Sequence, residues 1–184
     1  KAGEDCINQD DSLEAMRVCQ DYYKRILAEK PQDAEVTAIL DAARGTAEDR
    51  LVRNYLVAAQ LALTDNSDSL DALEIAEDFL SKARAIRPDS PEIELQHEMA
   101  RRYLKAQAEF NRGEWDPVIE NLEFIYANQM DYANGTARQI LYDAYMARGD
   151  SLLAKAEYNS ALSDFQRAAT LAQDDPESAL RIYE

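Results

Sequence analysis

The side chains that could do chemistry in this sequence are few and far apart. His97 is the only histidine, and it stands between Gln96 and Glu98 with no cysteine or serine close by. A catalytic triad or a zinc site therefore has almost nothing to be built from. We expect His97 to be a structural or solvent-facing residue.

Paired carboxylates are frequent, as at Glu92 and Glu94 or at Asp174 and Asp175. Such pairs can act as acid and base in hydrolysis, but these stand where helices are expected to begin, and capping and the helix dipole explain them. The five glycines are scattered and form no phosphate-binding loop. We therefore predict that the protein is not an enzyme and uses neither a cofactor nor a metal.

The two cysteines, Cys6 and Cys19, are 13 residues apart. A disulfide between them would fix the N-terminal end of the fold and would indicate an oxidising, extracytoplasmic compartment. Two free cysteines, one buried on a helix, would suit the cytosol equally well. Both alternatives stay open, and the localisation stays open with them.

Composition excludes several classes of partner. The 184 residues carry 36 acidic and 20 basic side chains, a net charge of −16. Binding to nucleic acid needs a basic surface, and an anionic membrane would repel this chain in the same way. No run of 18 apolar residues is present, so we expect no membrane insertion. Because the sequence does not begin with Met, we expect it to be a piece of a longer protein.

One pattern of apolar residues recurs along the chain. Steps of three, seven and ten residues, which mark one face of a helix, occur three times. The second copy follows the first by 42 residues and the third follows by 43, and a fixed period of this size is typical of stacked repeats. The three sets are Leu73, Ala76, Leu80 and Ala83; Trp115, Val118, Leu122 and Ile125; and Tyr158, Ala161, Phe165 and Ala168.

The clearest turn of this pattern lies at Arg112–Asp116. Gly113 is expected to end one helix in a left-handed conformation, Asp116 to cap the next, and Pro117 to stand in its first turn. In the same way, Ser90 and Pro91 are expected to open a helix, and Gly149 to let a neighbouring helix approach closely.

The N-terminal part departs from the period. A helix with Met16, Cys19, Tyr23 and Ile26 on one face follows an irregular start and is expected to be capped by Asp11 or Ser12. These residues show the same steps as a fourth copy, but they precede the next copy by 57 residues. An additional helix is predicted over residues 33–43 and is expected to end at Gly45, after which Thr46 would cap the next helix.

The last predicted helix pair shows a pattern with a family resemblance. A small residue and a large apolar one in the first helix are followed by alternating aromatic residues and alanines in the second: Gly149, Leu152, Tyr158, Ala161, Phe165 and Ala168. This pattern resembles the tetratricopeptide repeat. A looser match is formed by Ala106, Phe110, Gly113, Trp115, Val118, Leu122 and Ile125, and the second half of a repeat by Leu73, Ala76, Leu80, Ala83 and Pro88.

The resemblance implies an all-α fold in which antiparallel helix pairs stack into a right-handed superhelical solenoid. The family's usual period is about 34 residues, so a period of 42 to 43 implies first helices that are one or two turns longer. We predict one continuous array: residues 1–45 as atypical N-terminal helices, residues 46–176 as three helix pairs, and residues 177–184 as the start of a further helix.

By the same resemblance, the function would be non-catalytic binding of a peptide or protein segment in a concave groove. The alternative is a structural spacer or an oligomerising array. Because Asp143 and Asp150 would attract Lys or Arg and repel a terminal carboxylate, we expect a basic or amide-rich extended segment. The candidate binding residues are Tyr55, Tyr103, Gln107, Phe110, Asn111, Asp143, Met146 and Asp150, although the aromatic ones and Met146 could equally be packing residues.

Overall fold

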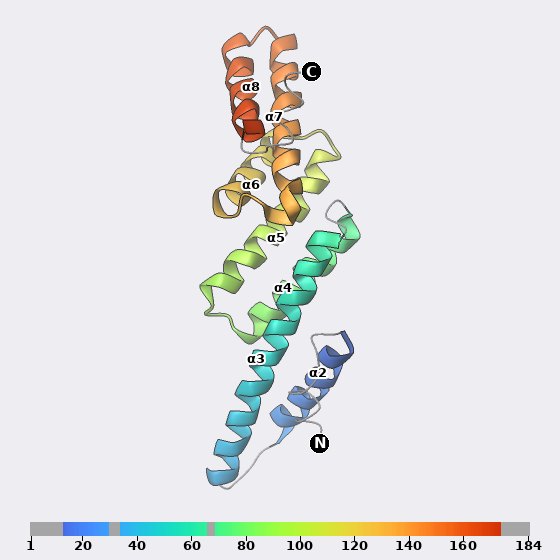
Figure 1. The fold of residues 1–184 in the computed structure, drawn as a ribbon, viewed down its shortest axis with the longest axis vertical. Helices are drawn as coiled ribbons and strands as arrows, with labels where there is room; N and C mark the ends of the chain where they lie inside the picture. The colour runs from blue at the N-terminus through green and yellow to red at the C-terminus, as the bar shows by residue number, and fades with distance from the viewer. Residues whose placement is uncertain (1–12, 30–33, 66–68, 174–184) are drawn as a thin grey trace. The chain divides into compact units, whose positions relative to one another are not determined.

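The computed structural model describes residues 13–29, 34–65 and 69–173, and every regular element in these ranges is a helix (Figure 1). The predicted all-α class is therefore confirmed. The elements are α2 (Leu13–Ala28), α3 (Ala34–Asp65), α4 (Leu70–Ile86), α5 (Pro91–Phe110), α6 (Trp115–Asn128), the short 3₁₀ helix η1 (Tyr132–Gly135), α7 (Thr136–Ala154) and α8 (Tyr158–Gln173). Residues 177–184, the predicted start of a further helix, lie outside the described ranges, as do Asp11 and Ser12.

The chain divides into two compact units. Unit 1 comprises Lys1–Leu63 and Ile75–His97, and unit 2 comprises Thr64–Glu74 and Glu98–Glu184. None of the described helices is long and apolar enough to cross a membrane.

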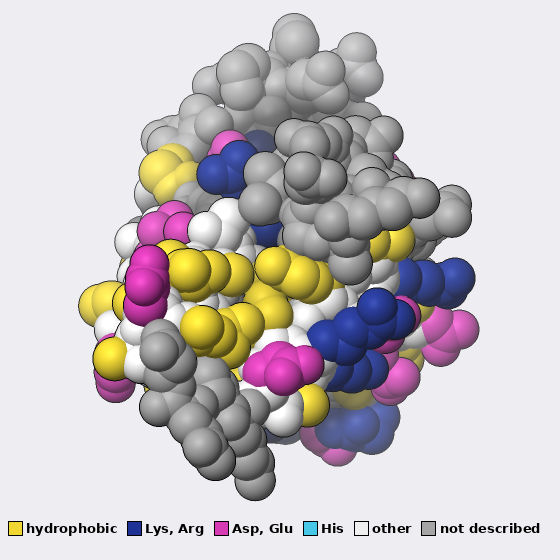
Figure 2. All heavy atoms as spheres, turned by 90° about the horizontal axis from the view of Figure 1, so that it is seen from below, with side chains coloured by type: hydrophobic (Ala, Val, Ile, Leu, Met, Phe, Trp, Pro, Cys, Tyr) yellow, Lys and Arg dark blue, Asp and Glu magenta, His cyan; other side chains and the backbone are white. Residues whose placement is uncertain are grey.

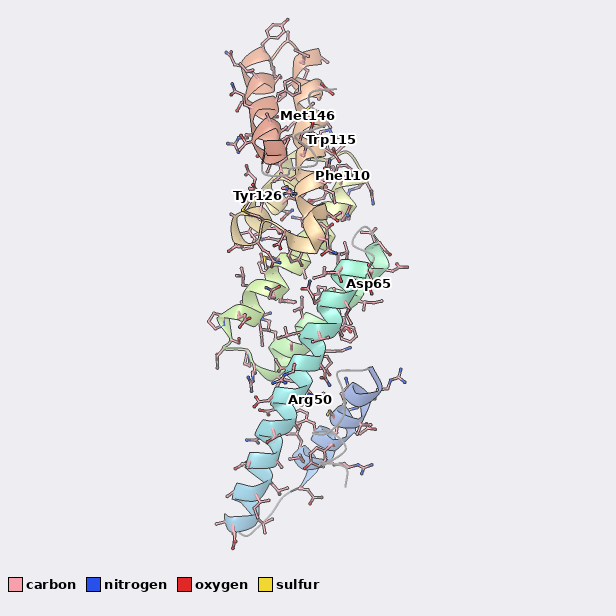
Figure 3. The ribbon with its side chains drawn as sticks, viewed as in Figure 1. Arg50, Asp65, Phe110, Trp115, Tyr126 and Met146 are labelled. Atoms are coloured by element: carbon pink, nitrogen blue, oxygen red, sulfur yellow. The ribbon has the colours of Figure 1, made fainter. Side chains whose placement is uncertain are left out.

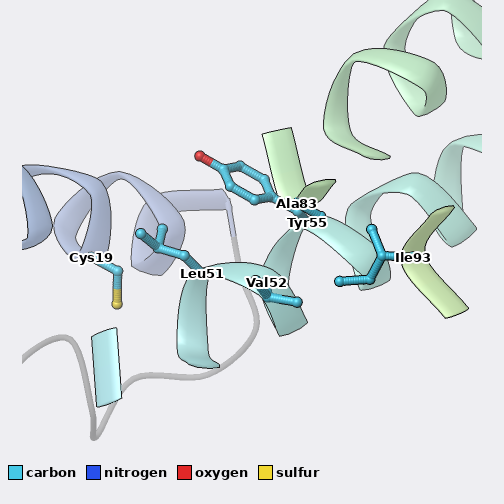
Figure 4. Close-up of a cluster of buried hydrophobic side chains, with 6 residues drawn as sticks. All are labelled: Cys19, Leu51, Val52, Tyr55, Ala83 and Ile93. Carbon is cyan, nitrogen blue, oxygen red and sulfur yellow. The ribbon is translucent and has the colours of Figure 1, made fainter. Parts of the chain in front are cut away.

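The core of unit 1 joins residues from four helices. Cys19 comes from α2; Leu51, Val52 and Tyr55 come from α3; Ala83 comes from α4 and Ile93 from α5 (Figure 4). The ring of Tyr55 also stacks on Phe79, with 6.0 Å between the ring centroids. These contacts bury apolar surface from all four helices, which is the main term that holds such a unit together.

Polar contacts add to this core at its margins. Gln20 on α2 donates to the hydroxyl of Tyr55 at 2.6 Å. His97 is buried, and its Nε2 lies 2.9 Å from Oε1 of Glu77, which joins α5 to α4. His97 is thus a structural residue, one of the two roles expected for it.

Cys19 is fully buried, and its sulfur is in a disulfide. The predicted partner, Cys6, lies outside the described residues, so the Cys6–Cys19 pairing stays a prediction.

Exposed apolar side chains gather at one end of unit 1. Figure 2 views the molecule from the end at which α2 finishes and α3 begins, and shows apolar side chains with charged ones around them. The large exposed apolar residues of these helix ends are Leu27, Val36 and Ile39.

The expected helix boundary at Gly45 and Thr46 is wrong, because α3 runs without interruption from Ala34 to Asp65. A glycine inside a helix costs only about 1 kcal/mol relative to alanine, which is too little to end a helix that packing stabilises. The hydroxyl of Thr46 caps nothing and instead donates to the carbonyl oxygen of Ala42 at 3.0 Å.

Unit 2 contains the same turn twice, 43 residues apart. Gly113 has a left-handed φ of 72°, and Ala156 has a φ of 61°. After Gly113, the amide of Glu114 donates to the carbonyl of Glu109 at 3.1 Å; after Ala156, the amide of Glu157 donates to that of Leu152 at 2.9 Å. The left-handed residues themselves donate to Phe110 and Leu153, respectively, at 2.9 and 3.0 Å. Both turns therefore satisfy the last helical carbonyls in the pattern of a Schellman motif.

At the turn between α5 and α6, one of the three expectations is wrong and two are confirmed. The residue that precedes α6 is Glu114, not Asp116, and its side chain makes no capping hydrogen bond. Asp116 lies inside the first turn of α6, where its carboxylate is directed to another helix. The left-handed Gly113 is confirmed, and Pro117 stands in the first turn of α6 as expected. At the start of α5, the hydroxyl of Ser90 accepts from the amide of Ile93 at 3.5 Å, so that cap is confirmed as well.

The recurring apolar face is buried, with three exceptions. The buried residues are Leu73, Ala76, Leu80 and Ala83, then Val118, Leu122 and Ile125, and then Ala161 and Ala168. Trp115 and Phe165 are only half-buried. Tyr158 was expected on the buried face, but its side chain is 65% exposed, because it begins α8 at the edge of the pair that α8 forms with α7 (Figure 1).

Helices α7 and α8 approach each other closely at Gly149, as predicted. A Cβ atom added there would lie 2.6 Å from Cε1 of Phe165, which is closer than two carbon atoms can pack. By contrast, a Cβ atom added at Gly45 in α3 would meet nothing within 4 Å.

These two glycines form a matched pair for a test. We expect Gly149→Ala to lower the free energy of unfolding by about 1–3 kcal/mol, because Phe165 must move. Gly45→Ala should raise it by about 0.5–1 kcal/mol, because alanine favours the helix. Urea unfolding followed by circular dichroism measures both. If Gly149→Ala stabilises the protein as much as Gly45→Ala does, the close approach is not a constraint on the fold.

Candidate functional site

Arg148 on α7 joins three helices of unit 2. Its Nε and Nη2 atoms donate to the two carboxylate oxygens of Asp164 on α8, each at 2.8 Å. Its Nη1 atom donates to Oδ1 of Asp116 on α6 at 2.7 Å. These hydrogen bonds, above all those that Arg148 donates to Asp164, raise the pKa of Arg148 above its already high value. Paired donors and acceptors of this kind fix both distance and orientation between helices.

A second polar cluster joins the same three helices. The hydroxyl of Tyr145 on α7 donates to Glu123 on α6, and Arg167 on α8 pairs with Glu123 and donates to the Tyr145 oxygen at 3.0 Å. Burial, followed by the hydrogen bond to Glu123, raises the pKa of Tyr145 to about 12. Tyr145 therefore stays protonated at physiological pH and acts as a donor.

Two adjoining hollows surround Arg148. One has a volume of about 600 Å³ and the other about 470 Å³, and both are lined in part by Asp116, Arg148 and Leu152. The remaining lining residues are Gly113, Glu114, Trp115, Pro117, Ser151 and Lys155 in the first, and Asn159, Ser160, Ser163 and Asp164 in the second.

The side chains that line these hollows are mostly polar or charged. The charge of Arg148 is balanced by Asp164 and Asp116, so the arginine is not a free anion-binding group. The other polar lining groups are serine hydroxyls, an amide, the carboxylate of Glu114, the indole of Trp115 and one lysine. In the described residues, no group of three or more histidine, cysteine or acidic side chains could hold a metal ion.

Three of the predicted binding residues are buried. Tyr55 lies in the core of unit 1. In unit 2, Tyr103 packs edge-on against Tyr132 with 5.5 Å between the ring centroids, and Gln107 is buried on the same helix. A ligand could reach these side chains only if their neighbours moved.

Two further candidates lie at the end of α5. The ring of Phe110 packs edge-on against Trp115, with 5.5 Å between the centroids, and Figure 3 shows the two residues close together where α5 gives way to α6. Asn111, the next residue along the chain, is exposed. Phe110 therefore has a packing partner, whereas Asn111 is accessible.

The last three candidates share one side of α7. Asp143 and Met146 are half-buried and Asp150 is exposed. Burial raises the pKa of Asp143, while a hydrogen bond from Gln139 at 3.1 Å opposes this shift. At 3.6 residues per turn, Arg148 lies roughly 150° around the helix from these three residues. The predicted face and the hollows at Arg148 are therefore on different sides of α7.

The sequence offered one signal for the Arg148 cluster that was missed. Asp164 is three residues after Ala161 and four before Ala168, so it lies on the inner side of α8, and it is buried. A buried carboxylate needs a partner, and an arginine on the facing helix can supply one.

The equivalent positions 43 residues earlier are also polar. Asn121 corresponds to Asp164 and Lys105 to Arg148. The buried Asn121 donates to Oε2 of Glu109 at 3.1 Å, and Lys105 lies 3.6 Å from the same carboxylate. Each helix pair of unit 2 thus has a buried polar side chain at the same position of its second helix, although the residue that this side chain contacts differs.

A further correspondence involves arginine and aromatic rings. Arg102 on α5 lies 4.2 Å from the ring centroid of Phe124 on α6, and the equivalent pair exchanges the two residue types: Arg167 on α8 lies 5.8 Å from the ring of Tyr145 on α7. Contacts of a cation with an aromatic face are attractive in either order.

The chain was compared with protein-family models, with curated proteins and with solved structures, and no match was found in any of the three.

The two carboxylates on Arg148 allow a test of the cluster. We expect Asp164→Asn to lower the free energy of unfolding by about 2 kcal/mol, because the half-buried guanidinium of Arg148 loses a charged acceptor at a buried position. Asp116→Asn removes an acceptor whose side chain is 83% exposed, so its effect should stay below about 1 kcal/mol. Urea unfolding of both variants measures the difference; equal effects would show that burial of Asp164 contributes nothing.

Proposed function

We propose that this protein is a non-catalytic helical-repeat scaffold that binds a peptide or protein segment. The observation that carries the proposal is the repetition in unit 2: the same left-handed turn and the same polar position in the interior recur 43 residues apart. Repeated helix pairs build extended surfaces on which several side chains can meet one partner. The resemblance of the sequence to tetratricopeptide repeats supports the same function.

The accessible face of α7 is the best candidate for the binding surface. Asp143, Met146 and Asp150 share this face, so an apolar side chain lies between two carboxylates. Such a face favours an extended segment that has Lys or Arg next to an apolar residue. The net charge of −16 also favours segments with Lys or Arg, because it attracts basic ligands over a longer range.

The alternative function, a structural spacer, is favoured by one observation. Tyr55, Tyr103 and Gln107 would be expected to be accessible in a groove, yet all three are buried. If binding does not occur, these residues serve packing alone and the array holds other parts of a larger protein in place.

A peptide array screened at ~50 mM and ~150 mM NaCl tests the proposal. We expect basic peptides to bind more tightly than acidic or neutral ones, and more tightly at low salt. The double variant Asp143→Lys with Asp150→Lys should lose this preference, by roughly tenfold or more in affinity, because two attractive charges become repulsive.

The matched control is Glu120→Lys with Asp131→Lys, which changes the net charge by the same amount at two exposed positions away from this face. It should weaken binding far less. If basic peptides bind the Asp143 and Asp150 variant as well as they bind the parent protein, or if no peptide binds, the scaffold proposal gives way to the spacer.

A further inference from the structure

The turn that leads into α7 contains the tripeptide Asn134-Gly135-Thr136. An asparagine that is followed by any residue except proline, and then by serine or threonine, is the acceptor sequence for N-linked oligosaccharides. The chain has eight asparagines, and only Asn134 is followed by serine or threonine at this spacing. The sequence thus offers one position for such a modification.

The backbone of this turn accounts for the first two residues of the tripeptide but not for the third. Asn134 has a φ of 54° and Gly135 a φ of 83°, and asparagine and glycine are among the residues that adopt such left-handed conformations most readily. Thr136 has helical φ and ψ angles of −60° and −38°, which most residues can adopt. The backbone conformation therefore does not require threonine at the third position.

Asn134 is held at the surface by neighbouring residues that are themselves buried. Tyr132 and Ala133 are only 2% and 3% exposed, and the ring of Tyr132 packs edge-on against that of Tyr103 on α5. The side chain of Asn134, by contrast, is exposed. A bulky hydrophilic group on Asn134 therefore extends into the solvent while Tyr132 and Ala133 keep the turn in place.

The side-chain amide of Asn134 can be modified without loss of its hydrogen bond. Its Nδ2 atom donates to the carbonyl oxygen of Thr64, near the end of α3, at 3.4 Å. This nitrogen carries two hydrogens, and the attachment of a sugar replaces only one of them. Because the other N–H can still donate to Thr64, the modification is compatible with the folded unit.

The disulfide at Cys19 is an independent observation that concerns the compartment. Cys19 is fully buried, and its sulfur is in a disulfide. Disulfides form and persist in oxidising, extracytoplasmic compartments, and proteins that enter the secretory pathway receive N-linked oligosaccharides on surface loops. A chain that acquires this disulfide is thus exposed to conditions in which the acceptor sequence is used.

We propose that Asn134 is an N-glycosylation site. The donor is an oligosaccharide that is linked through pyrophosphate to a membrane lipid, and an oligosaccharyltransferase catalyses the transfer. A bond forms between Nδ2 of Asn134 and C1 of the first sugar, and Nδ2 loses one proton to a base of the transferase. The bond between C1 and the pyrophosphate oxygen breaks, and the lipid pyrophosphate leaves with its electron pair, so no oxidant or reductant is needed. This modification is separate from peptide binding on α7 and does not depend on it.

Secretion of the 184-residue chain from a eukaryotic host, behind a signal peptide that is cleaved on export, tests the proposal. We expect an intact mass that exceeds 20.8 kDa by a whole number of sugar residues. The amidase that releases N-linked oligosaccharides should remove this added mass. In water enriched in heavy oxygen, it should also convert Asn134 to an aspartate that carries the heavy isotope. The isotope separates enzymatic release from the spontaneous deamidation to which Asn-Gly sequences are prone.

Substitutions within the tripeptide identify the acceptor. Asn134→Gln should abolish the added mass, and so should Thr136→Ala, which leaves Asn134 in place. Thr136→Ser should retain it, because serine also completes the acceptor sequence. The matched control is Asn111→Gln, which changes another exposed asparagine that lies outside any acceptor sequence and should keep the added mass.

Circular dichroism shows whether each variant is folded, so loss of the sugar is not confused with loss of structure. The proposal is overturned if the secreted parent protein has a mass of 20.8 kDa, whether or not its disulfide has formed. It is also overturned if the added mass persists in Asn134→Gln and Thr136→Ala, because the sugar is then attached to another residue.

Discussion

The left-handed residue that ends α5 and α7 is the constraint on which unit 2 depends. At Gly113 and Ala156 the chain leaves the helical conformation, the last carbonyls are satisfied by the amides that follow, and the next helix starts within two residues. Because the chain reverses so sharply, α8 must run back along α7, and their facing residues are set by the turn. A longer or looser loop would allow other registers, and the pairing at Arg148 would not be fixed.

Within this constraint, the two helix pairs keep their contacts while their residue types change. The arginine and the aromatic ring exchange places between Arg102 with Phe124 and Arg167 with Tyr145. The small residue that admits the partner helix is Gly149, and its equivalent 43 residues earlier is the fully buried Ala106. The stability of these helix pairs requires complementary residues rather than particular residue types. The residue types of the two pairs therefore differ, although their contacts occur at equivalent positions.

The features that could be predicted from the sequence are those that depend on interactions between residues close together in the chain. The start of α5 at Ser90 and the turn at Gly113 depend on neighbouring residues, and both were predicted. The break at Gly45 was wrong, since packing outweighs a local preference for ending a helix. Among the candidate site residues, helix periodicity could not tell the buried Tyr103 from the accessible Asp150, because that depends on which neighbouring helix covers each face. Arg148 was missed for the same reason: its partners are 16 and 32 residues away.

The central claim, that one turn is used twice, is tested most directly by exchanging its left-handed residues. Gly113→Ala should lower the free energy of unfolding by about 1 kcal/mol, because alanine is strained at a positive φ. Ala156→Gly should raise it by about the same amount, although glycine inside a helix would lower it. Urea unfolding of the two variants decides the matter: opposite signs support the repeated turn, and a destabilising Ala156→Gly would contradict it.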